Sequence, residues 1–127
     1  MNGFLLDTHA FIWFTEDSPR LNPRVRELLE SHDSKIFLSA ASLWEMAIKT
    51  AKGKLRLPGD PLEMARSEAI PSLDVTAQHA WGSRELPIIK GHNDPFDRLL
   101  AAQARIEGLT VLSADPVFDE YGVKRQW

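Results

Sequence analysis

The chain has 127 residues, of which 43% are apolar, and it carries a formal net charge of -3. This length and composition predict one compact domain over residues 1–127, with little room for a second core. The absence of cysteine excludes a disulfide framework and a thiolate nucleophile, and it restricts any metal to oxygen or imidazole ligands.

The sequence also constrains the cellular location of the protein and its binding partners. No apolar run reaches the length of a membrane span, and no basic segment precedes the short apolar stretch at the N-terminus, so we expect a cytoplasmic protein without a signal peptide. The spread of charges gives no general electrostatic case for a nucleic acid, so any such attraction must be local. The candidate cations, each also explained as a solvated surface charge, are Arg20, Lys49, Lys52, Lys54, Arg56, Lys90 and Arg98.

The first half of the chain predicts two strands and three helices. The predicted strands are 3–6 and 36–38, and the predicted helices are 8–14, 23–30 and 40–51. Ser39 caps the third helix, whose apolar residues recur with the spacing of one helical face. We therefore expect this face to be the buried one; it comprises Ala40, Leu43, Trp44, Ala47, Ile48 and Ala51.

The second half continues the alternation of helices and strands. Helices are predicted over 61–69, 77–85 and 95–107, and strands over 73–75, 110–113 and from Val123. Asp94 and Pro95 suit the start of the last helix, and Gly108 suits its end. Its expected buried face comprises Phe96, Leu99, Leu100, Gln103 and Ala104. Strands alternating with helices predict an α/β fold in three layers, with a mostly parallel central sheet flanked by helices.

Several acids are expected at one edge of this sheet. In an open parallel sheet, ligands bind beyond the carboxyl ends of the strands, where the strand order reverses. Asp7 directly follows the first strand, and Asp115 follows the last core strand by two residues. Glu45 lies two turns into the helix after the second strand, on the flank of the apolar face. There we expect it to face across the top of the sheet rather than into the core.

Each acid also has a local explanation. Asp7 and Asp94 suit helix caps, Asp97 suits the first turn of a helix, Glu45 can pair with Lys49, and Asp115 precedes a turn proline. These local explanations do not account for a cluster of the acids. Two carboxylates about 4 Å apart repel by roughly 4 kcal/mol at an effective dielectric of about 20. Such a cluster needs a cation or bound protons. Oxygen ligands suit Mg²⁺ or Mn²⁺, which predicts metal-assisted attack on a phosphate.

Four motifs along the chain resemble one known family. They are LLDTHAFIW, SAASLWEMAIK, HNDPFDRLLAAQA and LSAD followed by Phe118 and Tyr121. Together they resemble the PIN domains, and within them the VapC-type toxin ribonucleases of bacterial toxin-antitoxin pairs. The resemblance implies a PIN-like fold and an acidic site made of Asp7, Glu45, Asp97 and Asp115. It leaves Asp94 as a cap, as a water-mediated contact to a second metal, or as both.

The implied reaction is hydrolysis of an RNA phosphodiester with Mg²⁺ or Mn²⁺. Asp7 and Asp97 are the expected direct ligands, while Asp115 and Glu45 bind a second ion or orient water. Substrate contacts are assigned to Thr8, Lys49, His92 and Arg98. Each of these has an alternative: Thr8 as a helix cap, Lys49 as the partner of Glu45, His92 as an ordering residue of its loop, and Arg98 as the partner of a neighbouring acid, which we favour. A zinc site at His9 and His92 is a weaker alternative.

Partners are suggested by the helix after the first strand, since residues 10–14 are apolar almost all round. The resemblance implies a homodimer and an antitoxin whose C-terminal segment covers the acidic site. Trp13, Phe14 and Trp44 are the expected partner contacts; the alternative is a helix enclosed by its own core.

Two other functions compete with the nuclease. An aspartyl phosphotransferase is disfavoured, because His9 stands where a second aspartate is expected. A non-catalytic RNA-binding or scaffold module remains the main alternative, although the retention of every acid argues against it.

Overall fold

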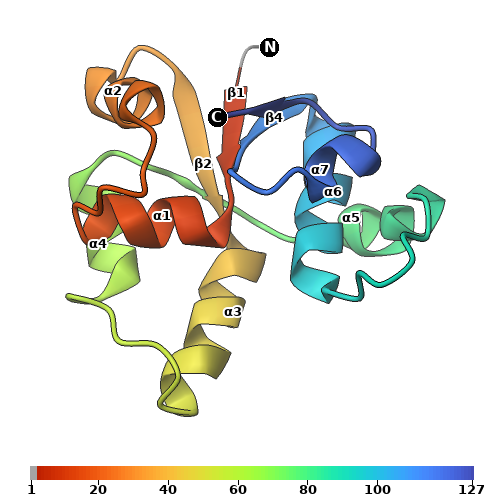
Figure 1. Cartoon of the computed structure of the whole chain (residues 1–127), viewed down its shortest axis with the longest axis horizontal. Helices are drawn as coiled ribbons and strands as arrows, with labels where there is room; N and C mark the ends of the chain where they lie inside the picture. The colour runs from red at the N-terminus through yellow and green to blue at the C-terminus, as the bar shows by residue number, and fades with distance from the viewer. Residues whose placement is uncertain (1–2) are drawn as a thin grey trace.

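Five parallel strands form one sheet at the centre of the molecule (Figure 1), and the computed structural model describes residues 3–127. The strand order is β3-β2-β1-β4-β5. The strands are β1 (Gly3–Leu6), β2 (Lys35–Ser39), β3 (Ser72–Leu73), β4 (Leu109–Leu112) and β5 (Arg125–Gln126). The helices are α1 (Thr8–Thr15), α2 (Pro23–Ser31), α3 (Ala40–Ala51), α4 (Pro61–Ser67), α5 (Ala77–Gly82), α6 (Pro95–Glu107) and α7 (Val117–Glu120), with a 3-10 turn at Ser83–Glu85.

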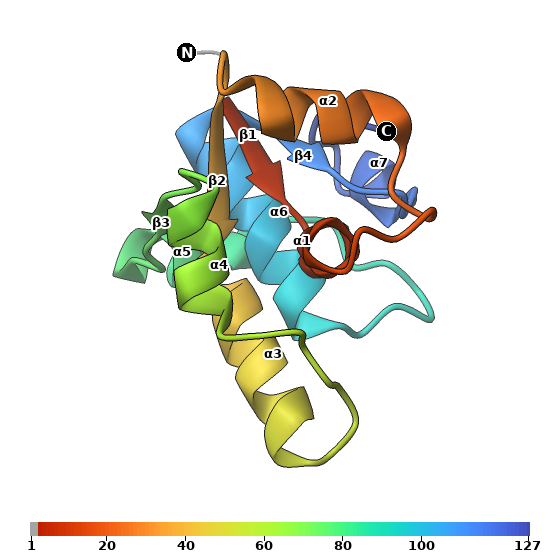
Figure 2. The ribbon, with the colours of Figure 1, turned by 90° about the vertical axis from the view of Figure 1, so that its left-hand side faces the viewer.

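Helices cover both faces of the sheet, so the predicted three-layer α/β architecture is confirmed. Figure 2 shows α1, α2 and α4 on one face, and Figure 1 shows α5, α6 and α7 on the other. A hydrophobic core packs against each face of the sheet. Successive side chains of a strand point alternately into one core and into the other. Leu6, paired in register with Leu38 and Leu112, lies in the first core, whereas Leu5, paired with Val111, lies in the second.

The strand order opens a crevice at the carboxyl ends of β1 and β4. From β1 the chain moves outward to β2 and β3, and it then crosses back over β1 to β4 and β5. This is the point of reversal at which open α/β sheets bind ligands. Within residues 3–127, no helix is both long and apolar enough to cross a membrane.

Several short elements differ from the sequence prediction. The strand predicted at 73–75 is Ser72–Leu73, because the carbonyl of Asp74 accepts from the Gln103 side chain and not from a strand. The edge strand begins at Arg125, since the Val123 amide closes the turn after α7 on Phe118. The helix predicted over 77–85 ends at Gly82 and continues as the 3-10 turn, and α7 was not predicted.

The predicted buried face of α3 is wrong. Trp44 is 62% exposed, and Ala47 and Ala51 are also exposed. The helix extends beyond the sheet (Figures 1 and 2), so the apolar residues of its outer half have no core to cover. Its buried residues are Ala41, Ser42, Glu45 and Met46.

A buried polar network joins the helices that carry the acids. The Gln103 amide oxygen on α6 accepts from the Ser39 hydroxyl at 2.6 Å, and Ser39 also caps α3 by accepting from the Ala41 amide. The Gln103 amide nitrogen donates to the Asp74 carbonyl at 3.2 Å. Both Gln103 and Ser39 are fully buried. This network sets α6 against the start of α3, so it fixes how Asp97 lies relative to Glu45.

We predict that Gln103→Leu lowers the free energy of unfolding by about 1–3 kcal/mol, because it leaves the buried Ser39 hydroxyl without its partner. Urea unfolding measures the loss. Gln78→Leu, at an exposed position of α5, is the matched control and changes stability by less than about 0.5 kcal/mol. Equal effects of the two substitutions would contradict the structural role of the network.

Candidate acidic active site

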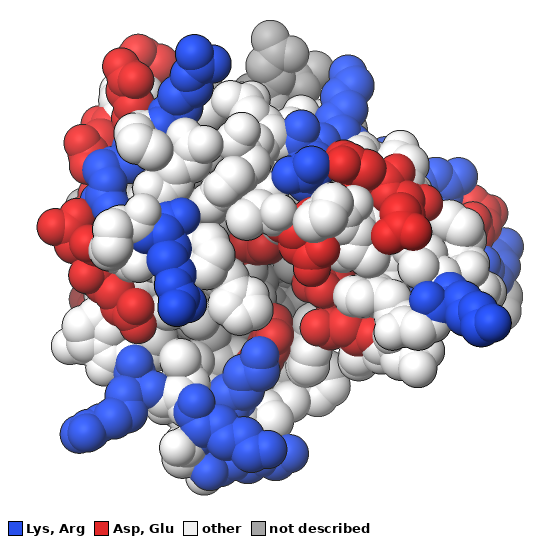
Figure 3. Space-filling view, in the orientation of Figure 1, with Lys and Arg blue, Asp and Glu red and all other residues white. Residues whose placement is uncertain are grey.

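A cavity of about 340 Å³ lies beyond the carboxyl ends of β1 and β4. Figure 3 shows acidic side chains around a hollow near the centre of this face. The cavity brings together all five acids singled out in the sequence and three of the four predicted substrate contacts. Its lining is Asp7, Thr8, His9, Glu45, Lys49, Gly91, His92, Asn93, Asp94, Asp97 and Asp115.

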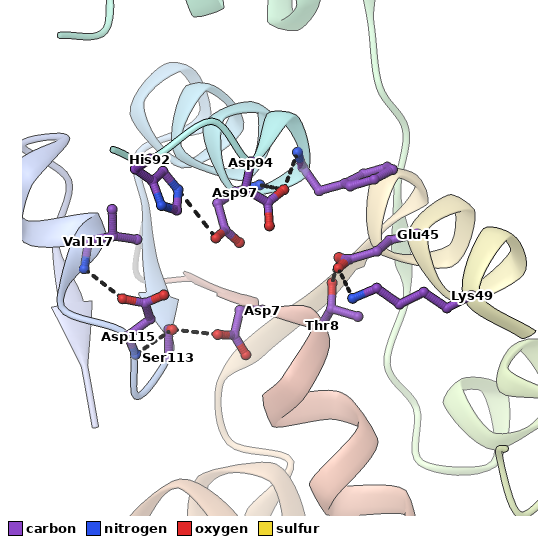
Figure 4. Close-up of polar contacts among 11 residues, drawn as sticks. Asp7, Thr8, Glu45, Lys49, His92, Asp94, Asp97, Ser113, Asp115 and Val117 are labelled. Carbon is purple, nitrogen blue, oxygen red and sulfur yellow. Dashed lines mark hydrogen bonds and ion pairs between the residues drawn. The ribbon is translucent and has the colours of Figure 1, made fainter. Parts of the chain in front are cut away.

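Asp7 is fixed by two bonds at the end of β1. One carboxylate oxygen accepts from the Ala10 amide at 2.7 Å and so caps α1, while the other accepts from the Ser113 hydroxyl (Figure 4). The side chain is almost fully buried. Burial raises the pKa of Asp7, and the bonds from Ser113 and Ala10 oppose that rise. Asp7 is therefore a helix cap and a buried, preorganised oxygen donor at once.

Ser113 is the residue that the sequence interpretation missed. Leu6 and Leu112 are register partners on β1 and β4, so the residues that follow them, Asp7 and Ser113, face each other across the two strands. The Ser113 hydroxyl also accepts from the Asp115 amide at 3.0 Å. A hydroxyl residue directly after the last core strand was the available signal.

Asp97 is the second acid of the cavity whose pKa is raised. Burial, followed by the charges of Asp94, Asp7, Asp115 and Glu45, raises the pKa of Asp97 to about 7. The Nε2 atom of His92 lies 3.6 Å from the Asp97 carboxylate. Burial and neighbouring negative charge both disfavour the charged form of a carboxylic acid, and burial contributes most here.

Asp94 and Asp115 both have the local roles that the sequence suggested. One oxygen of Asp94 accepts from the amides of Phe96 at 2.9 Å and Asp97 at 3.4 Å, which caps α6. One oxygen of Asp115 accepts from the Val117 amide at 2.9 Å, which begins α7. These hydrogen bonds use only one oxygen of each carboxylate. The other oxygen of Asp94 and of Asp115 is therefore not engaged by the helix start.

Glu45 lines the cavity, as its place on the flank of α3 predicted, but it is more buried than that place suggested. It is 4% exposed, and both of its oxygens are engaged. Thr8 donates to one oxygen at 2.7 Å, and the Lys49 ammonium donates to the other at 2.7 Å. The pair with Lys49 is thus formed, and the Thr8 hydroxyl faces Glu45 and Ser42 rather than open space.

Arg98 is absent from the cavity lining, and its predicted pairing with a neighbouring acid is wrong. Its guanidinium donates to the backbone carbonyls of Ser83, Leu86 and Pro87, with distances of 2.8–2.9 Å. Among residues 3–127 it forms no ion pair with an acid, because the loop after α5 supplies three acceptors. Arg98 instead fastens that loop to the start of α6.

The two histidines differ in their surroundings. His92 lies edge-on to Tyr121 at 5.9 Å, and its Nε2 is buried without a hydrogen-bond partner among residues 3–127. His9 is exposed on α1, with its ring 6.0 Å from that of Trp13. Both histidines line the cavity: His92 lies beside Asp97, and the charge of His9 acts to lower the pKa of Asp7.

The predicted partner contacts divide into two groups. Trp13 and Phe14 are partly buried against the first core, and Trp13 lies edge-on to Trp127 at 5.8 Å. Trp44 is exposed and lies edge-on to Phe96 at 5.4 Å, beside the head of α6. Trp44 is therefore the aromatic of the three that a partner can reach.

The donor set fits a hard divalent cation. Carboxylate oxygens dominate the cavity, and burial together with the charges of the neighbouring acids raises the pKa of Asp97. Within residues 3–127, no three His, Asp or Glu side chains stand close enough to ligate one ion together. Mg²⁺ accommodates this, because it keeps several waters and takes one or two carboxylates along with substrate oxygens. The residues that would hold it are Asp7 and Asp97, with Asp94 and Asp115 within the same cavity.

The chain is similar to known proteins over nearly its whole length. The sequence model of the PIN domain matches residues 4–124, whereas no curated protein matches the chain. A chain of VapBC2 from Rickettsia felis, solved bound to a promoter DNA fragment, is 19% identical at a TM-score of 0.67, covering 99% of this chain and 98% of its own. A chain of DNA-bound VapBC from Salmonella typhimurium is 21% identical at 0.70, covering 99% and 98%. A chain of FitAcB from Neisseria gonorrhoeae is 25% identical at 0.66, covering 96% and 95%.

We predict that Asp97→Asn stabilises the metal-free protein at neutral pH. Because the pKa of Asp97 is raised in the folded state, the folded state binds more protons than the unfolded state between about pH 4 and pH 7, and stability falls as pH rises through that window. Asparagine removes this loss, so the gain in Tm grows from about pH 4 to pH 7 and is constant above, reaching several degrees.

Thermal unfolding with chelator across this pH range measures the effect, with Asp33→Asn as the control at an exposed acid. A large fall in the Tm of Asp97→Asn would mean that its place in the first turn of α6 outweighs repulsion within the cavity.

Proposed function

The chain belongs to the PIN domain family, and we propose that it is a toxin ribonuclease that cleaves RNA with Mg²⁺ or Mn²⁺ and is neutralised by an antitoxin. The observation that carries this proposal is the cavity in which five carboxylates converge from four separate segments of the chain. Local capping explains each acid singly, but it does not explain their convergence at the point where the strand order reverses.

The charge of the cavity argues for a phosphate substrate bound through a cation. A bound divalent cation supplies charge neutralisation for the phosphate and lowers the pKa of attacking water. Asp7, held by Ser113 and Ala10, and Asp97, held on the first turn of α6, are the proposed ligands. The two hydrogen bonds fix the rotamer of Asp7 before any ligand arrives, which limits the reorganisation that binding requires.

The other polar groups of the cavity orient water or substrate and balance charge. Glu45 holds the Lys49 ammonium at the cavity, and Asp94 and Asp115 each retain one carboxylate oxygen for water-mediated contact. The buried Nε2 of His92 beside Asp97 is positioned to donate to a carboxylate or phosphate oxygen. No histidine base is required by this arrangement.

An antitoxin and a second copy of the chain complete the proposal. The VapBC and FitAcB chains with the same fold support an antitoxin partner, as do the sequence motifs shared with VapC-type toxins. Trp44, exposed beside the entrance of the cavity, is the proposed contact for such a partner. This account places the protein in the cytoplasm, where its RNA substrate is found.

Cleavage of a structured RNA pool tests the proposal. We expect fragments with Mg²⁺ or Mn²⁺ that disappear with chelator and that fall at least about a hundredfold in Asp7→Asn and in Asp97→Asn, because removing a charged group that acts on the reacting phosphate costs several kcal/mol. Asparagine still caps helices, so Asp7→Asn keeps the start of α1. Asp33→Asn, with the same change of charge at an exposed site, retains activity.

The opposing result is equally clear. No cleavage by folded protein shown to lack antitoxin, under any metal condition, would favour a non-catalytic RNA-binding or scaffold module on the same fold.

A further inference from the structure

A group of cations lies at the C-terminal end of α3, directly beside the acidic cavity. We call it the basic tip; it comprises Lys49, Lys52, Lys54 and Arg56. Lys52, Lys54 and Arg56 are exposed, and among residues 3–127 none of the three lies within 4 Å of a carboxylate, which leaves their charges uncompensated. Figure 3 shows Lys and Arg side chains gathered below the central acidic hollow, where α3 ends in Figure 1.

Favourable interaction with the helix dipole explains only part of this group. Cations in the last turn of a helix are stabilised by its C-terminal partial charge, which suffices for Lys49 and Lys52. Lys54 and Arg56 lie beyond the end of the helix. The chain is nevertheless ordered there, because the amides of Gly53 and Lys54 donate to the carbonyls of Thr50 and Lys49, and Gly53 takes a left-handed φ of 70°. The tip is therefore a fixed turn and not a loose tail.

Lys49 connects the tip to the cavity. It is the one lysine or arginine in the cavity lining, and its side chain is 41% exposed. An ammonium group has three N–H donors, of which Glu45 takes one, so two remain for an anion. A phosphate adjacent to the acids therefore meets Lys49 before any other cation of the described chain.

The negative net charge of the chain makes local cations necessary for binding a nucleic acid. A net charge of -3 and a cavity lined by carboxylates repel a polyanion, so a nucleic acid needs local cations that release its counterions. We propose that single-stranded RNA runs from the acidic cavity over the basic tip, with Lys49 on the phosphate next to the cleaved one and Lys52, Lys54 and Arg56 on those beyond. This proposal rests on RNA being the substrate.

The test compares two triple variants with the same change of charge. The first replaces Lys52, Lys54 and Arg56 by glutamine; the control replaces Arg24, Lys35 and Lys124, which are exposed cations away from α3. Binding of a short, unstructured, fluorescein-labelled RNA is measured by anisotropy with chelator, so that cleavage plays no part. All six positions are exposed, which leaves both variants folded.

We expect the tip variant to bind RNA at least about tenfold more weakly at about 100 mM salt. The slope of log K against log salt falls by roughly two, because each phosphate contact to single-stranded nucleic acid contributes about 0.7. The control variant binds as the wild type does. In a cleavage assay of the tip variant, the loss appears mainly in KM, since the lysines bind substrate away from the reacting atoms.

Three results would overturn the proposal: equal weakening by both variants, no weakening by the tip variant, and no binding of RNA by the wild type. Tight binding of polyglutamate that only the tip variant loses, with RNA binding intact, would assign the tip to an acidic protein segment instead. RNA binding that depends on the tip, without metal-dependent cleavage, would uphold this surface while refuting the nuclease.

Discussion

Repulsion between carboxylates at one edge of the sheet is the constraint on which the rest of this structure depends. The parallel order β3-β2-β1-β4-β5 brings the residues after β1 and β4 together, and Glu45 on α3 and the acids at the head of α6 join them. Burial, followed by the charges of the neighbouring acids, raises the pKa of Asp97 to about 7. Proteins of this size are stable by only about 5–15 kcal/mol, so an unbalanced acidic cluster is a substantial fraction of what holds the fold.

The fold tolerates this cluster because most of the acids also stabilise the local backbone. Asp7 caps α1, Asp94 caps α6 and Asp115 begins α7. Glu45 is held between Thr8 and Lys49. The same groups thus build the helix starts and present the remaining oxygens to the cavity. A choice between a capping role and a metal-binding role is therefore unnecessary for these residues.

How far the sequence predicts this arrangement depends on the range of the interaction. Helix caps at Ser39 and Asp94 are local, and both were predicted correctly. The burial of Glu45 was not, because the apolar spacing of α3 suggested a different inner face and hid the contact with Thr8, 37 residues away. Arg98 donates to three carbonyls of the loop after α5. No local sequence pattern predicts the path of that loop, so these contacts could not be predicted. The contact of Ser113 with Asp7 follows from the register of β1 and β4, which the sequence alone does not give.

We propose that the cavity binds a divalent cation through Asp7 and Asp97. The most direct measurement is titration of the metal-free protein with Mn²⁺, followed by the electron paramagnetic resonance signal of the unbound ion. The account predicts saturable binding by the wild type, lost in Asp7→Asn and in Asp97→Asn and retained in Asp33→Asn. Binding that is unchanged in Asp97→Asn, or absent from the wild type at millimolar Mn²⁺, would contradict it.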